Sequence, residues 1–114
     1  MKIDAYSFGS ITIDGKIYDN DLIIFPDKVK SNWWRKQGHV LDVDDLTEVI
    51  ESKPQILIIG TGASGLMQIA ESTRKKLQSC NIQLIEDLTK QACEIFNKKV
   101  AEDKNIVGAF HLTC

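Results

Sequence analysis

The stretch that most constrains the fold runs from Gln55 to Met67 and reads QILIIGTGASGLM. It opens with four apolar residues, 56–59, of which three are β-branched, and glycine ends the run. A short apolar run without polar alternation is typical of a strand that is buried on both faces. We therefore expect residues 56–59 to form a central strand of a sheet that is covered by helices.

The residues after this strand, GTGASG at 60–65, form a literal G-x-G-x-x-G. A charged, helical stretch follows, and then a second apolar strand that ends in Glu86, about 20 positions past the loop as in dinucleotide-binding proteins. Glycines let backbone N–H groups approach a phosphate, and Glu86 could hold a ribose. The candidate ligand contacts of this loop are Gly60, Thr61, Gly62, Ser64 and Gly65.

The alternative interpretation of the loop is a tight strand-to-helix connection that needs residues free to take positive φ. Residues 66–69, LMQI, delay the helix, so its N-terminus is displaced from a pyrophosphate. Only one β-α-β unit follows the loop, where a dinucleotide site uses two halves. We therefore predict that NAD, NADP and FAD do not bind and that no cofactor is required. Binding of a small anion stays open.

Length, charge and cysteine spacing exclude several classes of protein. A chain of 114 residues suits a single domain, 1–114. A net charge of −2 with mixed signs gives no general attraction to nucleic acid or anionic lipid. The sequence has no long apolar run and no apolar leader, so we expect no membrane span and a cytoplasmic protein. Three cysteines without C-x-x-C spacing predict that neither a metal nor a disulfide is needed for folding.

The order of elements predicts an α/β fold. The first third reads as β structure: Asp14-Gly15 is a hairpin signal between alternating segments, and 22–25 is a buried strand. Helices are expected at 44–52, 70–80 and 89–101, with Asp44 and Thr89 as caps. The last strand is expected at 106–112. Alternating helices and strands favour helices that cover a largely parallel sheet.

Five segments in this order resemble one known family. They are SFGSI at 7–11, DGKIY at 14–18, Trp34-Arg35 with Gly38-His39, IGTGASGLM at 59–67, and HLTC at 111–114. Together they resemble the small single-domain family that includes the adipogenesis-associated protein of animals, the mitochondrial complex I assembly factor 3 and many uncharacterised bacterial and archaeal proteins.

The resemblance implies a three-layer fold with a central mixed five-stranded sheet, in the order 2-1-5-3-4, and an extra N-terminal β layer. It implies that the last strand runs antiparallel to the others, which would put His111 near the start of the 55–59 strand, away from the glycine loop. It implies no established enzyme activity, no dinucleotide and no catalytic residues.

A second candidate site is the segment from Trp33 to His39, with Trp34, Arg35 and His39 as candidate ligand contacts. An arginine beside aromatic rings can hold a carboxylate or phosphate, and histidine exchanges protons near neutral pH. The alternative is packing, in which a tryptophan fills the core and the arginine stacks on it.

Two further clusters are better explained by structure than by chemistry. His111 and Cys114 are three residues apart, so on a strand they would face opposite sides, which argues against a thiolate–imidazole pair. A buried, hydrogen-bonded His111 is expected instead. The acids Asp42, Asp44, Asp45 and Glu48 fit no calcium loop, and a helix N-terminus already favours them. Cys80 and Cys93 are expected to be small core residues.

Two functions remain after this reading. The first is a non-enzymatic protein-interaction or assembly module, by analogy with the assembly factor. The second is a small-molecule or anion-binding protein, or an enzyme, that uses the cleft between residues 34–39 and 60–65. A ligand-sized cleft lined by these polar groups would favour the second, and an exposed apolar patch would favour the first.

Overall fold

A computed structural model describes residues 1–102 and 105–114. The first three strands, β1 (Ile3–Ser7), β2 (Ser10–Ile13) and β3 (Lys16–Tyr18), form an antiparallel sheet. Asp14 and Gly15, both with positive φ, make the turn between β2 and β3, as the sequence predicted. This sheet is the expected N-terminal β layer.

The central sheet contains β4 (Leu22–Ile24), β5 (Val29–Lys30), β7 (Ile56–Gly60), β9 (Gln83–Asp87) and β10 (Ile106–Phe110). Its order is β5-β4-β10-β7-β9. Counted along the chain, this is the order 2-1-5-3-4 that the family resemblance implied. β7 lies inside the sheet, and all of its residues are buried, which confirms the expectation for 56–59.

The direction of the last strand corrects one expectation. β10 pairs in parallel with β7, with Ile106 opposite Ile56 and Phe110 opposite Gly60, and it is antiparallel only to β4. The physical reason is the helix that joins β9 to β10, because a helical crossover returns the chain to the same end of the sheet. Consequently His111 lies beside the glycine loop, and the expectation that it lies near the start of the 55–59 strand was wrong.

The helices are η1 (Val43–Leu46), α1 (Thr47–Ser52), α2 (Glu71–Ser79) and α3 (Thr89–Glu102). They match the three predicted helices within about two residues, the usual uncertainty of helix ends. The cap of the first is Asp42 rather than Asp44: its side chain accepts the Asp44 N–H, while Asp45 accepts the Asp42 N–H in return. A short parallel pair, β6 (Val40–Leu41) with β8 (Gln68–Ile69), was not predicted from the sequence.

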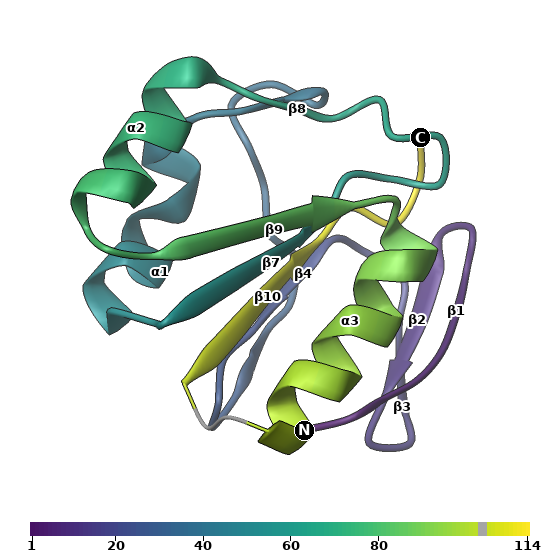
Figure 1. Cartoon of the computed structure of the whole chain (residues 1–114). Helices are drawn as coiled ribbons and strands as arrows, with labels where there is room; N and C mark the ends of the chain where they lie inside the picture. Colours follow the sequence, from purple (N-terminus) through teal and green to yellow (C-terminus); the bar gives the residue numbers. More distant parts are fainter. Residues whose placement is uncertain (103–104) are drawn as a thin grey trace.

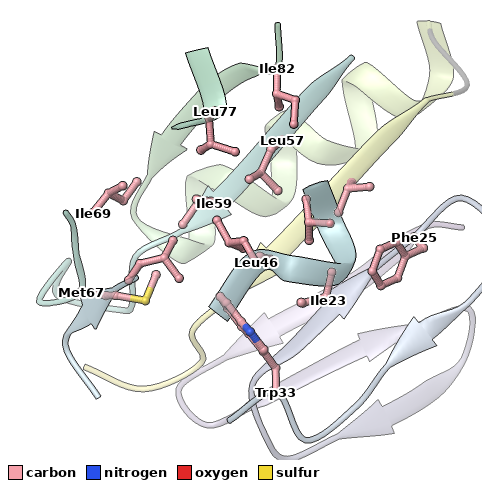
Figure 2. Packing of buried hydrophobic residues seen from close by; sticks show 14 residues of the cluster. Ile23, Phe25, Trp33, Leu46, Leu57, Ile59, Met67, Ile69, Leu77 and Ile82 are labelled. Atoms are coloured by element: carbon pink, nitrogen blue, oxygen red, sulfur yellow. The ribbon is translucent and has the colours of Figure 1, made fainter. Parts of the chain in front are cut away.

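Two apolar clusters cover the two faces of the central sheet. Alternate residues of β7 face opposite sides, so Leu57 and Ile59 join one cluster while Ile56 and Ile58 join the other. η1, α1 and α2 lie against the first face, and α3 with the N-terminal sheet lies against the second (Figure 1). Trp33, Leu46, Met67 and Leu77 all belong to the first cluster (Figure 2). The architecture is therefore the three-layer α/β fold that was expected.

Candidate functional site

The glycine loop directs its backbone N–H groups into the protein. The Thr61 N–H donates to the Asp87 carbonyl, the Gly62 N–H to Thr89 Oγ1, and the Ala63 N–H to the Thr113 carbonyl. The N–H groups of residues 65–67 likewise donate to backbone carbonyls. Within residues 61–67, the Ser64 N–H is the only backbone N–H group without an acceptor in the described part of the chain. A phosphate could use the loop as a cradle only by displacing these bonds.

The glycine loop is hydrogen-bonded to the start of α3 and not to α2, the helix that follows the loop in the sequence. α2 begins at Glu71, so residues 66–70 separate the loop from it, as the sequence suggested. Thr89 accepts from Gly62 at 2.8 Å and donates its hydroxyl proton to the His111 carbonyl at 2.6 Å. Its hydroxyl therefore joins the loop to the residue after β10, which ends at Phe110 and not at 112 as expected, and this role differs from the capping role expected of Thr89.

A cavity of about 500 Å³ lies beside the loop, where Thr61, Ser64 and Gly65 contribute to its wall. Glu86 lies in the same wall, and its carboxylate pairs with Arg74 at 2.6 Å. The acid that a dinucleotide site would need for the ribose is thus engaged with an arginine. Gly60 faces the interior, because a Cβ there would lie 2.9 Å from both Phe110 and Thr89.

The segment from Trp33 to His39 contains both buried and exposed side chains. Trp33 is buried, its indole N–H donates to the Asp45 carbonyl, and the Arg35 guanidinium lies 4.7 Å from its ring centroid. Trp34 is 79% exposed. His39 is exposed, and its ring meets the edge of the His111 ring with 6.1 Å between centroids. The structure therefore splits the two neighbouring tryptophans between the core and the surface.

Asp21, Arg35 and His111 form a charge cluster that was not predicted from the sequence. Asp21 Oδ2 lies 2.7 Å from Arg35 Nη2 and 2.7 Å from His111 Nδ1, and the Leu112 N–H donates to Asp21 Oδ1 at 2.7 Å. The side chains of Arg35 and His111 are only 5% and 7% exposed. The cluster therefore fastens the segment after β10 to the start of β4 and to the tryptophan segment.

Burial by itself would raise the pKa of the Asp21 carboxyl. The hydrogen bonds from His111, from the Leu112 N–H and from Arg35, with the charge of Arg35, outweigh this effect and hold the pKa below its ordinary value. A proton on His111 Nδ1 makes that nitrogen the donor to Asp21. His111 Nε2, Arg35 Nε and Arg35 Nη1 are buried without a hydrogen-bond partner among the described residues.

A cavity of about 270 Å³ lies above this cluster, next to Trp34. It is built from three segments that meet at the end of the sheet: the turn before β4, the tryptophan segment and the residues after β10. Its walls come from Asp19, Asn20, Asp21, Asn32, Trp33, Trp34, Arg35, Gly38, Leu112 and Thr113. The predicted residues Trp34 and Arg35 thus line one cavity, and Thr61, Ser64 and Gly65 line another.

Four exposed apolar residues lie in segments that contact residues 111–114 or the glycine loop, and we call the surface of these segments the end face. Gly9, next to Phe8, donates its N–H to the Leu112 carbonyl, and the Leu66 N–H donates to the Cys114 carbonyl. Trp34 shares its cavity with Leu112, and a Cβ on Gly65 would lie 2.8 Å from Leu88. Figure 1 shows the C-terminal segment beside the β1–β2 turn and the glycine loop. Its apolar members are Phe8, Trp34, Leu66 and Leu88, which are 65%, 79%, 51% and 39% exposed.

The acidic cluster makes structural contacts, and of the two cysteines expected in the core Cys93 is buried whereas Cys80 is half-buried. Glu48 pairs with Lys28 and Lys30, and Asp42 and Asp45 form the capping box. Within the described residues no group of three or more His, Cys, Asp or Glu side chains is arranged to hold a metal ion. Burial raises the pKa of the Cys93 thiol to about 12, as expected of a core residue.

In the part of the chain that the structure describes, no helix has the length and apolar character to span a membrane.

Comparison with known proteins agrees with the fold. A conserved hypothetical protein from Pyrococcus horikoshii OT3 is 27% identical, with 100% of each chain covered and a TM-score of 0.83. An outer membrane protein from Bartonella henselae is 26% identical over 98% of this chain and 94% of its own, with a TM-score of 0.84. A Mth938-like domain protein from Bordetella pertussis is 16% identical over 97% of this chain and 85% of its own, with a TM-score of 0.79, and this likeness shows the fold alone.

The family itself is identified by a match that spans nearly the whole chain. Residues 3–111 match the family described as "Protein of unknown function (DUF498/DUF598)". The resemblance read from the five segments is thereby confirmed. This protein belongs to the DUF498/DUF598 family of proteins of unknown function.

Proposed function

We propose that this protein is a non-enzymatic protein-interaction module that binds its partner with the end face. The observation that carries the proposal is the distribution of exposed apolar side chains. Among the described residues five large apolar side chains are exposed, and four of them, Phe8, Trp34, Leu66 and Leu88, belong to the end face. Single exposed apolar residues are ordinary, whereas a group of them on one surface is typical of an interaction site.

The composition of this surface supports a protein partner. Tryptophan is among the residues that contribute most to protein–protein binding, and Trp34 projects from a backbone that its buried neighbours Trp33 and Arg35 hold in place. A rigidly presented aromatic side chain loses little freedom on binding. The fifth exposed residue, Ile17 on β3, offers a matched control because its exposed fraction equals that of Phe8, at 65%.

The charge cluster supports a binding role over a catalytic one. Asp21, Arg35 and His111 carry the groups suited to acid–base chemistry, but Arg35 and His111 both pair with Asp21, and their own side chains are only 5% and 7% exposed. A general base must come within hydrogen-bond reach of the proton that it removes. We therefore assign the cluster to holding the end face together, in a protein that we place in the cytoplasm.

A capture experiment tests this proposal. The immobilised protein, with Trp34→Ala, Phe8→Ser, Leu66→Ser and Ile17→Ser variants, is exposed to lysate of the source organism after each variant is shown to melt normally. We expect the wild type and Ile17→Ser to retain the same proteins, and the other variants to lose them. Equal retention by all variants, or equal loss with Ile17→Ser, would contradict the proposal.

The second candidate function is the binding of a small molecule or anion, and the two cavities of about 270 and 500 Å³ favour it. Pockets that bury small ligands start at about this size. A thermal-shift screen with nucleotides, phosphates and small amines tests it, because a ligand of the native state raises the melting temperature by mass action. A flat response across the screen would remove this candidate.

A further inference from the structure

The charged residues that line the cavity beside Trp34 indicate which sign of charge a ligand there should carry. Two acids and one arginine line it, namely Asp19, Asp21 and Arg35. Of these, Asp21 and Arg35 neutralise each other through their 2.7 Å ion pair. The remaining charge on the wall is the carboxylate of Asp19, so the cavity is net negative.

Among the described residues, only one of the three guanidinium nitrogens of Arg35 has partners, and the other two are buried. Arg35 Nη2 already contacts Asp21 Oδ2, the Gly38 carbonyl at 3.2 Å and His111 Nδ1 at 3.1 Å. Arg35 Nε and Nη1 are shut off from solvent, and the guanidinium lies over the Trp33 ring. An anion in the cavity would meet the Asp19 carboxylate, whereas the two unpartnered nitrogens of Arg35 are buried.

The polar side chains that are exposed in this cavity and have no partner among the described residues include a carboxylate and two amides. Asp19, Asn20 and Asn32 form no side-chain hydrogen bond or ion pair within the described chain, and all three are exposed at the cavity wall. Their carboxylate and amide oxygens accept hydrogen bonds. The exposed indole of Trp34 borders the same cavity and presents an electron-rich face that attracts cations.

Resting on the function proposed above, we propose that this cavity receives the basic side chain, arginine or lysine, of the partner protein. The cationic head bonds to Asp19 and to the amide oxygens of Asn20 and Asn32, while its aliphatic stem lies against Trp34. Arginine suits such a site well, because its planar guanidinium both stacks on an indole and pairs with a carboxylate. Trp34 lines this cavity, and the other apolar residues of the end face contact the remainder of the partner.

The test uses three blocked tripeptides, acetyl-Gly-Arg-Gly-amide and its glutamine and glutamate counterparts, titrated into isotope-labelled protein and followed by NMR. The arginine peptide is expected to shift the Trp34 indole signal and the side-chain amide signals of Asn20 and Asn32. Asp19→Asn and Trp34→Ala are each expected to raise its Kd by about fivefold. The control Asp27→Asn removes an exposed acid from another cavity and is expected to leave Kd unchanged.

Three results would overturn the inference: no shifts with the arginine peptide, equal affinity for the glutamine peptide, or unchanged affinity in Asp19→Asn. Methylguanidinium binding as tightly as the arginine peptide would overturn the assignment to a polypeptide. The proposed function fails in a different way. If capture depends on Trp34 while the arginine peptide does not bind, the interaction face stands and the basic side chain is wrong.

Discussion

At the scale of single residues, Asp21 connects the start of β4 to two other segments of the end face. Its two oxygens bond to Arg35, His111 and the Leu112 backbone N–H, which come from two separate segments. Asp19, two residues earlier, is exposed and makes none of these contacts. The pair offers a direct comparison of a half-buried and an exposed carboxylate, two residues apart.

We predict that Asp21→Asn destabilises the fold by about 3 kcal/mol, because removing one partner leaves the Arg35 charge buried without its counterion. Asp19→Asn should change the free energy of unfolding by less than about 0.5 kcal/mol, as is usual for surface substitutions. Urea unfolding followed by circular dichroism measures both values. Similar stabilities of the two variants would mean that the cluster does not hold the fold.

The lowered pKa of Asp21 predicts a pH dependence. A carboxyl whose pKa is depressed on folding contributes stability above its unfolded pKa of about 3.9, and this contribution is lost as the pH falls through the lower folded value. The stability difference between wild type and Asp21→Asn should therefore shrink between about pH 5 and pH 3. Unfolding free energies at steps of pH test this, and a difference that is constant or grows toward low pH would contradict the account.

At the scale of elements, the glycine loop is a packing device between β7, α3 and the segment after β10. Gly62 has φ +111°, and a Cβ there would lie 2.3 Å from the Cys114 carbonyl carbon and 2.9 Å from His111 Cδ2. Gly65 has φ +72°, but its nearest neighbour is the flexible end of Leu88 at 2.8 Å. The two glycines therefore differ in steric constraint as well as in backbone conformation.

We predict that Gly62→Ala destabilises the fold by at least about 2 kcal/mol, because backbone must move to admit the methyl group. Gly65→Ala should lose about 1 kcal/mol from its left-handed conformation alone. Gly38→Ala is the control, since no atom lies within 4 Å of the place that its methyl group would occupy. Thermal and urea melts of the three variants would contradict the account if Gly62→Ala were as stable as Gly38→Ala.

The elements also show which features a sequence can predict. The apolar run at 56–59 and the Asp14-Gly15 turn are local patterns, and β7 and the β2–β3 hairpin formed where they indicated. β6 and β8 have two residues each, too few for any periodicity. The charge cluster escaped prediction because His111 meets Arg35 and Asp21 across 76 and 90 residues of sequence. The wrong direction assigned to β10 also placed His111 at the far end of the sheet.

At the scale of the whole molecule, the two ends of the central sheet differ in character. The carboxyl ends of β7 and β10 carry the end face, the charge cluster and both cavities described above. In open α/β sheets this is the edge at which ligands bind. The two apolar clusters on the faces of the central sheet thus form the core beneath the end face.

We predict that NAD, NADP and FAD show no heat of binding in titration calorimetry. The loop N–H groups donate within the protein, and Glu86 is paired with Arg74, so the two anchors of a dinucleotide are engaged. Each missing charge-assisted bond costs roughly 1.5–3 kcal/mol of affinity, and two or three of them separate micromolar from undetectable binding. Micromolar binding that Glu86→Ala abolishes would show that the loop opens to ligands.

The central claim, that the end face is the binding surface, is tested most directly by site-specific photo-crosslinking in living cells of the source organism. A benzophenone amino acid is placed at Phe8, Trp34 or Leu66, and at Ile17 and Asp27 as exposed controls on other surfaces. The account predicts adducts with another protein from the three end-face positions and none from the two controls. Adducts from Ile17 or Asp27, with none from Trp34, would contradict it.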